Sequence, residues 1–246
     1  MRFILKCLRY NSTELLINNR NMEEDKRIIS ISKDQLASLP IATYDRTIVL
    51  VDTIDDALKA VEELSKEKVI GFDTETKPSF KRGQTNKVSL LQLSSHSTCY
   101  LFRLNHIGLH PAVKSLLENK EILKVGLSIH DDFHNLNKIC ALNPDGFIDL
   151  QAYVKQFRIA DNSLARIYAV IFGKRISKGQ RLTNWEADEL TPNQQAYASL
   201  DAFACVSIYD YLSQGHFKPL ESKYLTLPPV PTVQAPKDDA KESITK

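Results

Sequence analysis

In the stretch VIGFDTET, residues 69 to 76, an apolar run typical of a buried strand continues without a turn into two acidic residues. Alternate residues of a strand point to the same face, so Asp73 and Glu75 lie on one face of the predicted sheet. Two neighbouring carboxylates repel each other and resist burial, so they need raised pKa values, cationic partners or a bound metal ion. Hard cations such as Mg²⁺ prefer carboxylate oxygens. The alternative is that the strand ends at Phe72 and that water solvates both acids.

The composition is that of an ordinary globular protein. Of 246 residues, 43% are hydrophobic and 8% aromatic, and the net charge of +2 neither indicates nor excludes a nucleic-acid partner. The four cysteines form no CxxC pair, which favours a reducing compartment. No apolar run reaches the roughly twenty residues that span a bilayer, and Lys6 and Arg9 interrupt the N-terminal segment. We therefore expect a cytoplasmic protein without a membrane partner, and translation from Met22 is a further hypothesis.

Strand-like and helix-like segments alternate along the chain. Apolar and β-branched runs predict strands at 47–51, 69–75, 87–95, 98–104, 122–127 and 147–150, the third and fourth joined as a hairpin. Helices are predicted at 53–66, with an apolar stripe of Ile54, Leu58, Val61 and Leu64, and at 111–119, 131–140, 163–172 and from Pro192 to about Leu212. This order indicates an α/β domain with a mixed sheet. We expect a leader over 1–45, one domain over 46–220 and a disordered tail over 221–246.

The segment KVGLSIHDDFHNLNKIC contains two adjacent aspartates, Asp131 and Asp132. In a helix that begins near Asp131, Asp132 shares a face with Leu136 and Ile139, whereas Asp131 lines up with polar residues. The periodicity therefore selects Asp132 as the acid directed toward the interior. Asp131 is expected to face water near the helix N-terminus, where a negative charge is favourable. The alternative is that Asp132 is a second capping acid.

The helix NQQAYASLDAFACVSIYDYL carries an acid on its apolar stripe. Its stripe consists of Ala196, Tyr197, Leu200, Ala204, Ile208 and Tyr211. Asp201 falls on this stripe one turn after Tyr197, and an acid in the middle of a helix cannot be a cap. Because an acid on a buried face needs a partner, Asp201 is a candidate functional residue. The start of the helix is marked by Thr191 as a cap, by a proline in the first turn and by Gln194 three residues on.

Together these residues resemble the DEDD 3′–5′ exonucleases of the tyrosine subtype, the branch that contains ribonuclease D and the Werner-type exonuclease domain. The first motif is FDTE, with Asp73 and Glu75, the second is VG followed by Asp132, and the third is Tyr197-x-x-x-Asp201. LLQL after the first motif and NW-x(5)-LTPNQQAYASLDA also match. The resemblance covers about residues 46 to 214. It implies a ribonuclease H-like α/β fold, with a central mixed β-sheet flanked by helices.

The resemblance also implies a reaction. Asp73, Glu75, Asp132 and Asp201 would hold two divalent metal ions, Mg²⁺ or Mn²⁺, and Tyr197 would orient the attacking water. In the family pattern Asp73 bridges both ions, Glu75 and Asp201 hold the ion that activates water, and Asp132 holds the other. The expected substrate is DNA or RNA with a free 3′ end, single-stranded or frayed, and the products are nucleoside 5′-monophosphates released stepwise. Without metal, four neighbouring carboxylates would destabilise the protein or become partly protonated.

Substrate contacts and two other functions stay open. Lys178 and Arg181 are candidate phosphate-binding residues, and the alternative is a solvated basic loop. Trp185 either stacks on a base or packs before the last helix. One alternative function is a non-catalytic nucleic-acid-binding module on the same fold, which would typically lack an acid or the tyrosine. The other is an unrelated metal-carboxylate hydrolase that acts on small phosphoesters. All four acids and the tyrosine are present, which favours the nuclease.

Overall fold

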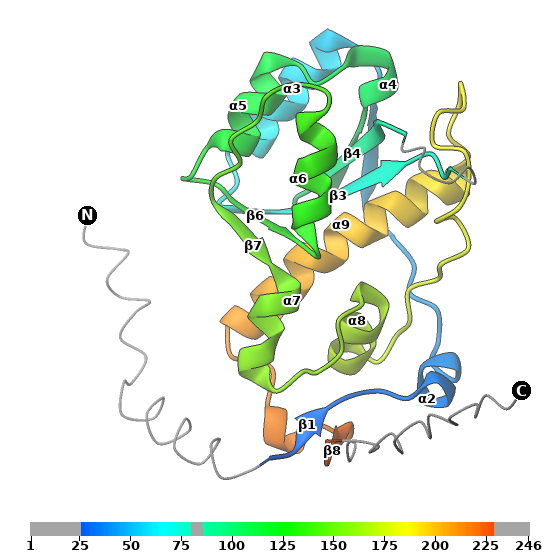
Figure 1. Cartoon of the computed structure of the whole chain (residues 1–246), viewed down its shortest axis with the longest axis vertical. Coiled ribbons are helices and arrows are strands. Elements are labelled where there is room, and N and C mark those ends of the chain that lie inside the picture. Colours follow the sequence, from blue (N-terminus) through cyan, green and yellow to red (C-terminus); the bar gives the residue numbers. More distant parts are fainter. Residues whose placement is uncertain (1–25, 80–85, 229–246) are drawn as a thin grey trace, which may run out of the picture. The chain divides into compact units, whose positions relative to one another are not determined.

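The computed structural model describes residues 26–79 and 86–228 (Figure 1). The chain divides into two units, and the larger one, Ile29–Leu225, contains the central sheet and its helices. The other unit, Met1–Ile28 with Thr226–Lys246, holds only the outermost described residues. The hypothetical start at Met22, most of the predicted leader and the end of the predicted tail lie outside the described residues. In the described part, no helix combines the length and the apolar character that a membrane span requires.

Within the described residues, the central sheet has six strands, and its mixed character agrees with the prediction. Their order across the sheet is β2 (Thr47–Val51), β5 (Thr98–Arg103), β4 (Val88–Ser94), β3 (Val69–Thr76), β6 (Leu123–Gly126) and β7 (Phe147–Asp149). Only β4 runs antiparallel to its neighbours, and it forms the predicted hairpin with β5. Strand β3 lies inside the sheet between β4 and β6, so the two acids of FDTE lie on an interior strand.

Three helices cover one face of the sheet: α3 (Ile54–Leu64), α5 (Pro111–Glu118) and α6 (Ile129–Asn137), drawn in the upper part of Figure 1. Ile70 and Phe72 of β3 pack in the core beneath them. The predicted stripe of α3 is partly wrong, because Ile54 and Leu58 are 39% and 46% exposed. The buried residues of α3 are Ala57, Ala60 and Leu64. Small side chains at the contact let a helix approach its neighbours closely, and here the two larger side chains turn toward water.

The other face is crossed by α9 (Pro192–Ser213), which Figure 1 shows running diagonally across the sheet. A Cβ atom on Gly71 of β3 would lie 1.8 Å from the carbonyl oxygen of Ala202, so only glycine permits this approach. The helix α8 (Leu164–Phe172) also packs on α9, through a core that includes Ile167 and Ile208. Because α9 lies between the sheet and α8, it is buried on several sides and the predicted single stripe describes only part of its buried surface.

The start of α9 is the predicted capping box. The Gln194 amide N–H donates to Thr191 Oγ1 at 3.2 Å, and the Thr191 N–H donates to Gln194 Oε1 at 3.0 Å. The Gln194 side chain also donates to Thr183 Oγ1 at 3.0 Å and to the carbonyl oxygen of Asn184 at 3.2 Å. These bonds satisfy helix donors that would otherwise be unpaired, and they tie the preceding segment to the helix start.

Several short elements have no counterpart in the sequence prediction. They are β1 (Ile28–Ile29), α2 (Lys33–Ala37), α4 (Leu104–Ile107), α7 (Leu150–Tyr153), the 3₁₀ helices η1 (Val154–Phe157) and η2 (Pro219–Glu221), and β8 (Leu225–Thr226), which forms a two-stranded sheet with β1. Ile29 and Ile31 are fully buried, although residues 1–45 show no periodicity. Asp161 accepts a hydrogen bond from the Ile31 N–H at 3.0 Å, and Arg166 bonds Asp161 at 3.0 Å. The bond between Ile31 and Asp161 joins residues 130 positions apart, so it leaves no local sequence pattern.

Candidate metal centre

The strand β3 directs two of the predicted acids toward α9. One oxygen from each of Asp73, Glu75 and Asp201 forms a group in which all three atoms lie within 4.8 Å of one another. Glu75 and Asp201 are only 9% and 7% exposed. The strand continues to Thr76 and pairs with β4 along its whole acidic end. The alternative in which the strand ends at Phe72 and both acids are solvated is therefore wrong.

The helix α9 supplies Asp201 and, one turn earlier, Tyr197. Burial raises the pKa of Asp201 to about 7, although a hydrogen bond from Tyr197 and the charge of Lys178 lower it. Burial also raises the pKa of Tyr197, with further increases from the charges of Asp201 and Glu75, so this hydroxyl stays neutral near pH 7. The Tyr197 ring lies 6.1 Å from the Trp185 ring at an interplanar angle of 32°. Since Trp185 is fully buried, it packs against Tyr197 and is not free to stack on a base.

The electrostatics of the three clustered acids disfavour their charged forms. Burial raises the pKa of Asp73 well above its usual value, and the charges of Asp201, Glu75 and Asp132 raise it further. Burial raises the pKa of Glu75 to about 9, with contributions from Asp201 and Asp132 and an opposing effect of Arg181. Several carboxylates that disfavour one another's ionisation, with oxygen atoms this close, form the donor set that Mg²⁺ or Mn²⁺ prefers. The residues present therefore fit a hard divalent cation.

Asp132 lies at the border of this cluster. In the first turn of α6 the Asp131 side chain is 90% exposed, whereas Asp132 is partly buried, as the periodicity predicts. The Thr74 hydroxyl donates a hydrogen bond to Asp132 Oδ1. Burial raises the pKa of Asp132 to about 6, and the bond from Thr74 lowers it. Among the described residues, the group of oxygens within 4.8 Å does not include Asp132, although its charge raises the pKa values of Asp73 and Glu75.

The two predicted phosphate-binding residues lie in the segment between α8 and α9. Both side chains are exposed, and the Arg181 N–H donates to the Lys178 carbonyl oxygen at 3.3 Å. The charge of Lys178 lowers the pKa of Asp201, and that of Arg181 lowers the pKa of Glu75. The two cations are therefore near enough to the acids to act on them electrostatically, while they remain accessible to a ligand.

Sequence reasoning missed two polar residues beside the acids. Thr74 points to the opposite face of β3 from Asp73, and the alternation of strand residues would have placed it on the side of α6. Gln92 lies directly across from Asp73 in the register of β3 and β4. Its side chain is fully buried, and its amide has no hydrogen-bond partner in the described part of the protein. The sequence signal for Gln92 is a single polar residue within the apolar strand LLQL.

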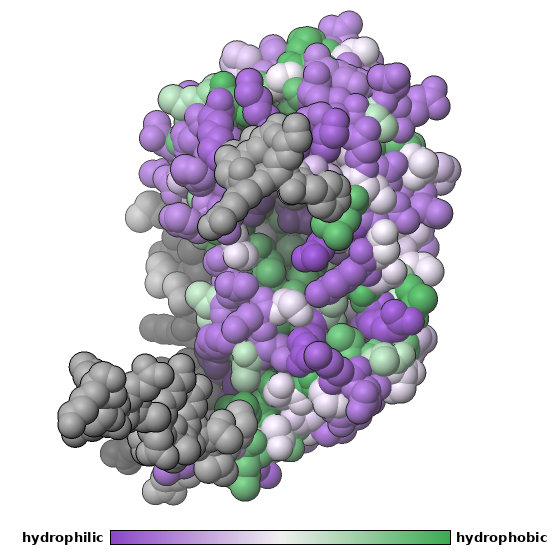
Figure 2. All heavy atoms as spheres, turned by 45° about the vertical axis from the view of Figure 1, so that its right-hand side comes forward, coloured by the Kyte–Doolittle hydropathy of each residue, from purple (hydrophilic) through white to green (hydrophobic). Residues whose placement is uncertain are grey.

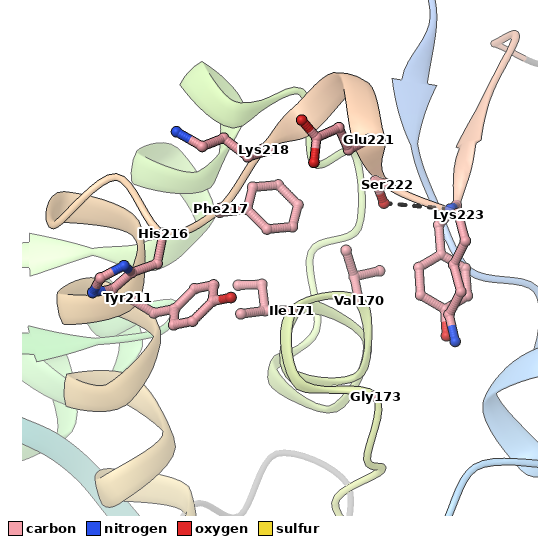
Figure 3. Close-up of a pocket in the computed structure, with 11 residues that line it drawn as sticks. Val170, Ile171, Gly173, Tyr211, His216, Phe217, Lys218, Glu221, Ser222 and Lys223 are labelled. Atoms are coloured by element: carbon pink, nitrogen blue, oxygen red, sulfur yellow. Dashed lines mark hydrogen bonds between the residues drawn. The ribbon is translucent and has the colours of Figure 1, made fainter.

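One side of the molecule has a hollow in its surface (Figure 2). Figure 2 brings this side forward and shows hydrophobic residues in the hollow with hydrophilic residues around it. A separate cavity of about 340 Å³ lies at the other end of α9 (Figure 3), between Tyr211, Phe217 and the α8 residues Val170 and Ile171. None of the four acids lines this cavity, and neither does Tyr197, so it is distinct from the candidate metal centre.

Comparison with known proteins is consistent with this geometry. The sequence model of a family described as 3′–5′ exonuclease matches residues 48–215. Over 185 residues the chain is 32% identical to the bifunctional 3′–5′ exonuclease/ATP-dependent helicase WRN of Mus musculus, covering 71% of this chain and 13% of that protein. The exonuclease mut-7 homolog of Aedes aegypti is 26% identical over 190 residues, which cover 67% of this chain and 26% of that protein. The chain thus spans about a quarter or less of these relatives' lengths.

Solved structures give the same fold. The Aedes aegypti Nibbler EXO domain superposes with a TM-score of 0.64 at 25% identity, covering 73% of this chain and 96% of that one. Escherichia coli RNase D, an exoribonuclease involved in structured RNA processing, superposes with a TM-score of 0.62 at 22% identity, covering 69% of this chain and 44% of that one. The mixed sheet flanked by helices is therefore the ribonuclease H-like fold of these exonuclease domains, as the sequence predicts.

Proposed function

The chain belongs to the 3′–5′ exonuclease family, and we propose that it is an active, metal-dependent exonuclease that shortens nucleic acids from the 3′ end. One observation carries this proposal: oxygens of Asp73, Glu75 and Asp201, from two separate elements, lie within 4.8 Å of one another. Burying acids together is costly without cations, so a fold that does so is suited to binding them. The products would be nucleoside 5′-monophosphates, released one at a time.

The acids would hold two divalent ions, Mg²⁺ or Mn²⁺. Asp73, Glu75 and Asp201 are the main ligands in this proposal, and Asp132, bonded by Thr74, completes the set from the other side of β3. When bound, such ions stabilise negative charge on the attacking and leaving oxygens of a phosphodiester. The surrounding side chains contribute a shielded environment, since Glu75 and Asp201 are almost completely buried.

Tyr197 would orient the attacking water. Its raised pKa keeps the hydroxyl protonated, so it acts by hydrogen bonding and not as a strong base. The buried Trp185 ring beside it and the hydrogen bond to Asp201 restrict where the hydroxyl can lie. A water held between Tyr197 and the acids would be directed toward the terminal phosphodiester.

Lys178 and Arg181 would bind the phosphates of the terminal nucleotides. Both are exposed and both act on the acids electrostatically, so a strand bound there would reach the candidate metal centre. A single strand or a frayed end suits this arrangement, because the terminal phosphodiester must approach buried carboxylates. RNase D, of similar fold, is an exoribonuclease, and both RNA and DNA are substrates to test here.

The test is a gel assay with 5′-labelled single-stranded DNA and RNA oligonucleotides of the same sequence, with Mg²⁺ or Mn²⁺. We expect a ladder that shortens from the 3′ end, and no ladder with Asp73→Asn or with a chelator. A 3′-phosphorothioate linkage should stop the ladder at its first step. If the protein binds the oligonucleotides without shortening them, it is a non-catalytic nucleic-acid-binding module. If it hydrolyses only small phosphoesters, it is a metal-carboxylate hydrolase of such compounds.

A further inference from the structure

The carboxylate of Asp149 joins the starts of two helices. Asp149 is the last residue of β7, and its Oδ1 accepts hydrogen bonds from the Gln151 N–H at 2.8 Å and the Ser128 N–H at 3.0 Å. Its Oδ2 accepts a hydrogen bond from the Ile129 N–H at 3.3 Å. By accepting from the Gln151 N–H, Asp149 serves as the N-cap of α7. The other two bonds go to the start of α6, about twenty residues earlier in the chain.

The start of α6 depends on this external carboxylate. The residue before the helix, Ser128, has a left-handed backbone with φ of 60°, which is uncommon for a residue other than glycine. Its own side chain makes no capping hydrogen bond. Asp149 therefore replaces the usual local cap, because its two oxygens accept from the backbone N–H groups of Ser128 and Ile129.

The first turn of α6 carries Asp132, three residues after Ile129. In the sheet, Gly126 of β6 is paired with Asp149 of β7, so Asp149 lies beside the short connection between the end of β6 and the start of α6. A Cβ atom on Gly126 would lie 2.5 Å from the Ile129 side chain, so the turn is also tightly packed. The path from Asp149 to Asp132 thus runs through one short, closely packed turn.

We propose that Asp149 is a positioning residue of the candidate metal centre, which holds the start of α6 and thereby fixes the Asp132 carboxylate. This inference rests on the proposed function in one respect, namely that Asp132 takes part in binding metal. Asp149 acts through α6 and not as a ligand, because both of its oxygens already accept backbone hydrogen bonds. Mutation of a residue that orients a metal-binding side chain typically lowers metal affinity or activity by about 10- to 100-fold.

The test compares Asp149→Ala with Thr53→Ala. Thr53 is the N-cap of α3, where its Oγ1 accepts from the Asp56 N–H at 3.1 Å, and α3 carries none of the proposed site residues. Both variants lose a helix cap and should lower the melting temperature. Only Asp149→Ala should weaken Mn²⁺ binding, by about 10-fold in a calorimetric titration. Equal Mn²⁺ affinities for the two variants would overturn the proposal.

A double-mutant cycle tests the route through Asp132. If Asp149 acts by placing Asp132, Asp149→Ala should add little to the loss of Mn²⁺ affinity caused by Asp132→Asn, whereas independent effects would add. If Asp149→Ala does not fold, Asp149→Asn, which keeps one acceptor oxygen, takes its place. Its Mn²⁺ affinity should lie between that of the wild-type protein and the value expected for Asp149→Ala. Full additivity would overturn the proposal, and so would a wild-type protein that binds no Mn²⁺. A wild-type protein that binds Mn²⁺ without shortening oligonucleotides would contradict the proposed function alone.

Discussion

The helices α9 and α6 both bring acids to β3, but they are held in place in different ways. The long α9 begins with its own capping box, lies directly on β3 at Gly71 and is buried on several sides. The short α6 lacks a side-chain cap of its own, and its start is held by Asp149 of a neighbouring strand. Asp201 on α9 accordingly lies within the tight group of acids, whereas Asp132 on α6 lies at its border. The centre therefore has a rigid side, formed by β3 and the closely packed α9, and a supported side, formed by α6, whose start is held by Asp149.

The largest expected effect is on the rigid side. Asp201→Asn keeps the shape of the side chain but removes a buried charge that would bind cations, so exonuclease activity should fall by about 1000-fold or more. The measurement is the single-turnover rate on a 5′-labelled oligonucleotide. Asp131→Asn is the matched control, because Asp131 is an exposed neighbour of Asp132 and should leave the rate within about twofold. Similar losses in both variants would contradict the assignment of Asp201.

The second prediction concerns the close contact between α9 and β3 at Gly71. Gly71→Ala would place a methyl group 1.8 Å from the Ala202 carbonyl oxygen, so α9 must shift or the fold must weaken. We expect a loss of about 3 kcal/mol in the free energy of unfolding, measured by urea denaturation. Gly179→Ala is the control, since its nearest neighbour would be the Ser177 hydroxyl oxygen at 3.5 Å, an ordinary contact. A Gly71→Ala protein as stable as the wild type would show that α9 does not press on β3.

Most of this rigid side could be predicted from the sequence. Strand alternation places Asp73 and Glu75 on one face, and Thr191, Pro192 and Gln194 mark the start of α9, because these signals depend on residues a few positions apart. On the supported side, the helix period predicts only the choice of Asp132 over Asp131 as the inward acid.

The supported side could not be predicted in the same way. The bonds from Thr74 to Asp132 and from Ser128 to Asp149 join residues 58 and 21 positions apart, and such pairs are fixed only by the arrangement of elements. The burial of Ile29 and Ile31 is similar, since their partners, such as Asp161, lie in a distant segment. The short helices α4 and α7 are too brief to show a helical period.

The pH dependence of the metal-free protein is the third prediction. Burial raises the pKa of Glu75 to about 9 and that of Asp201 to about 7, above their ordinary values near 4. The folded state therefore binds more protons than the unfolded state between about pH 4 and pH 9, so the free energy of unfolding should fall as the pH rises through this window. Thermal unfolding in a chelator measures the effect, and Mg²⁺ should raise the melting temperature more near pH 8 than near pH 6.

A Glu75→Gln variant tests whether the buried acids cause this pH dependence. It lacks one carboxyl group with a raised pKa, so its free energy of unfolding should fall less steeply with pH than that of the wild-type protein. Asp55→Asn, which changes an exposed acid of α3, should keep the wild-type slope. A metal-free protein whose stability is flat or rises from pH 5 to pH 9 would contradict the burial of these acids.

The smallest expected effect is on the supported side. Thr74→Val removes the hydroxyl that bonds Asp132, so the pKa of Asp132 should rise and activity should fall by about 10-fold near pH 6. Because the bond lowers the pKa of Asp132, part of the loss should be recovered at higher pH, which a pH–rate profile would reveal. The control variant Thr76→Val should have the same pH–rate profile as the wild-type protein. A pH-independent loss in Thr74→Val would indicate a packing defect and not a loss of this bond.

The central claim is that Asp73, Glu75, Asp132 and Asp201 together bind divalent metal ions. A direct measurement of ion binding tests this claim. In a calorimetric titration at pH 8, the wild-type chain should bind two Mn²⁺ ions, and Asp73→Asn, which alters the acid proposed to touch both ions, should lose both binding events while remaining folded. A wild-type protein that binds no Mn²⁺, or an Asp73→Asn variant that binds as well as the wild type, would contradict the account.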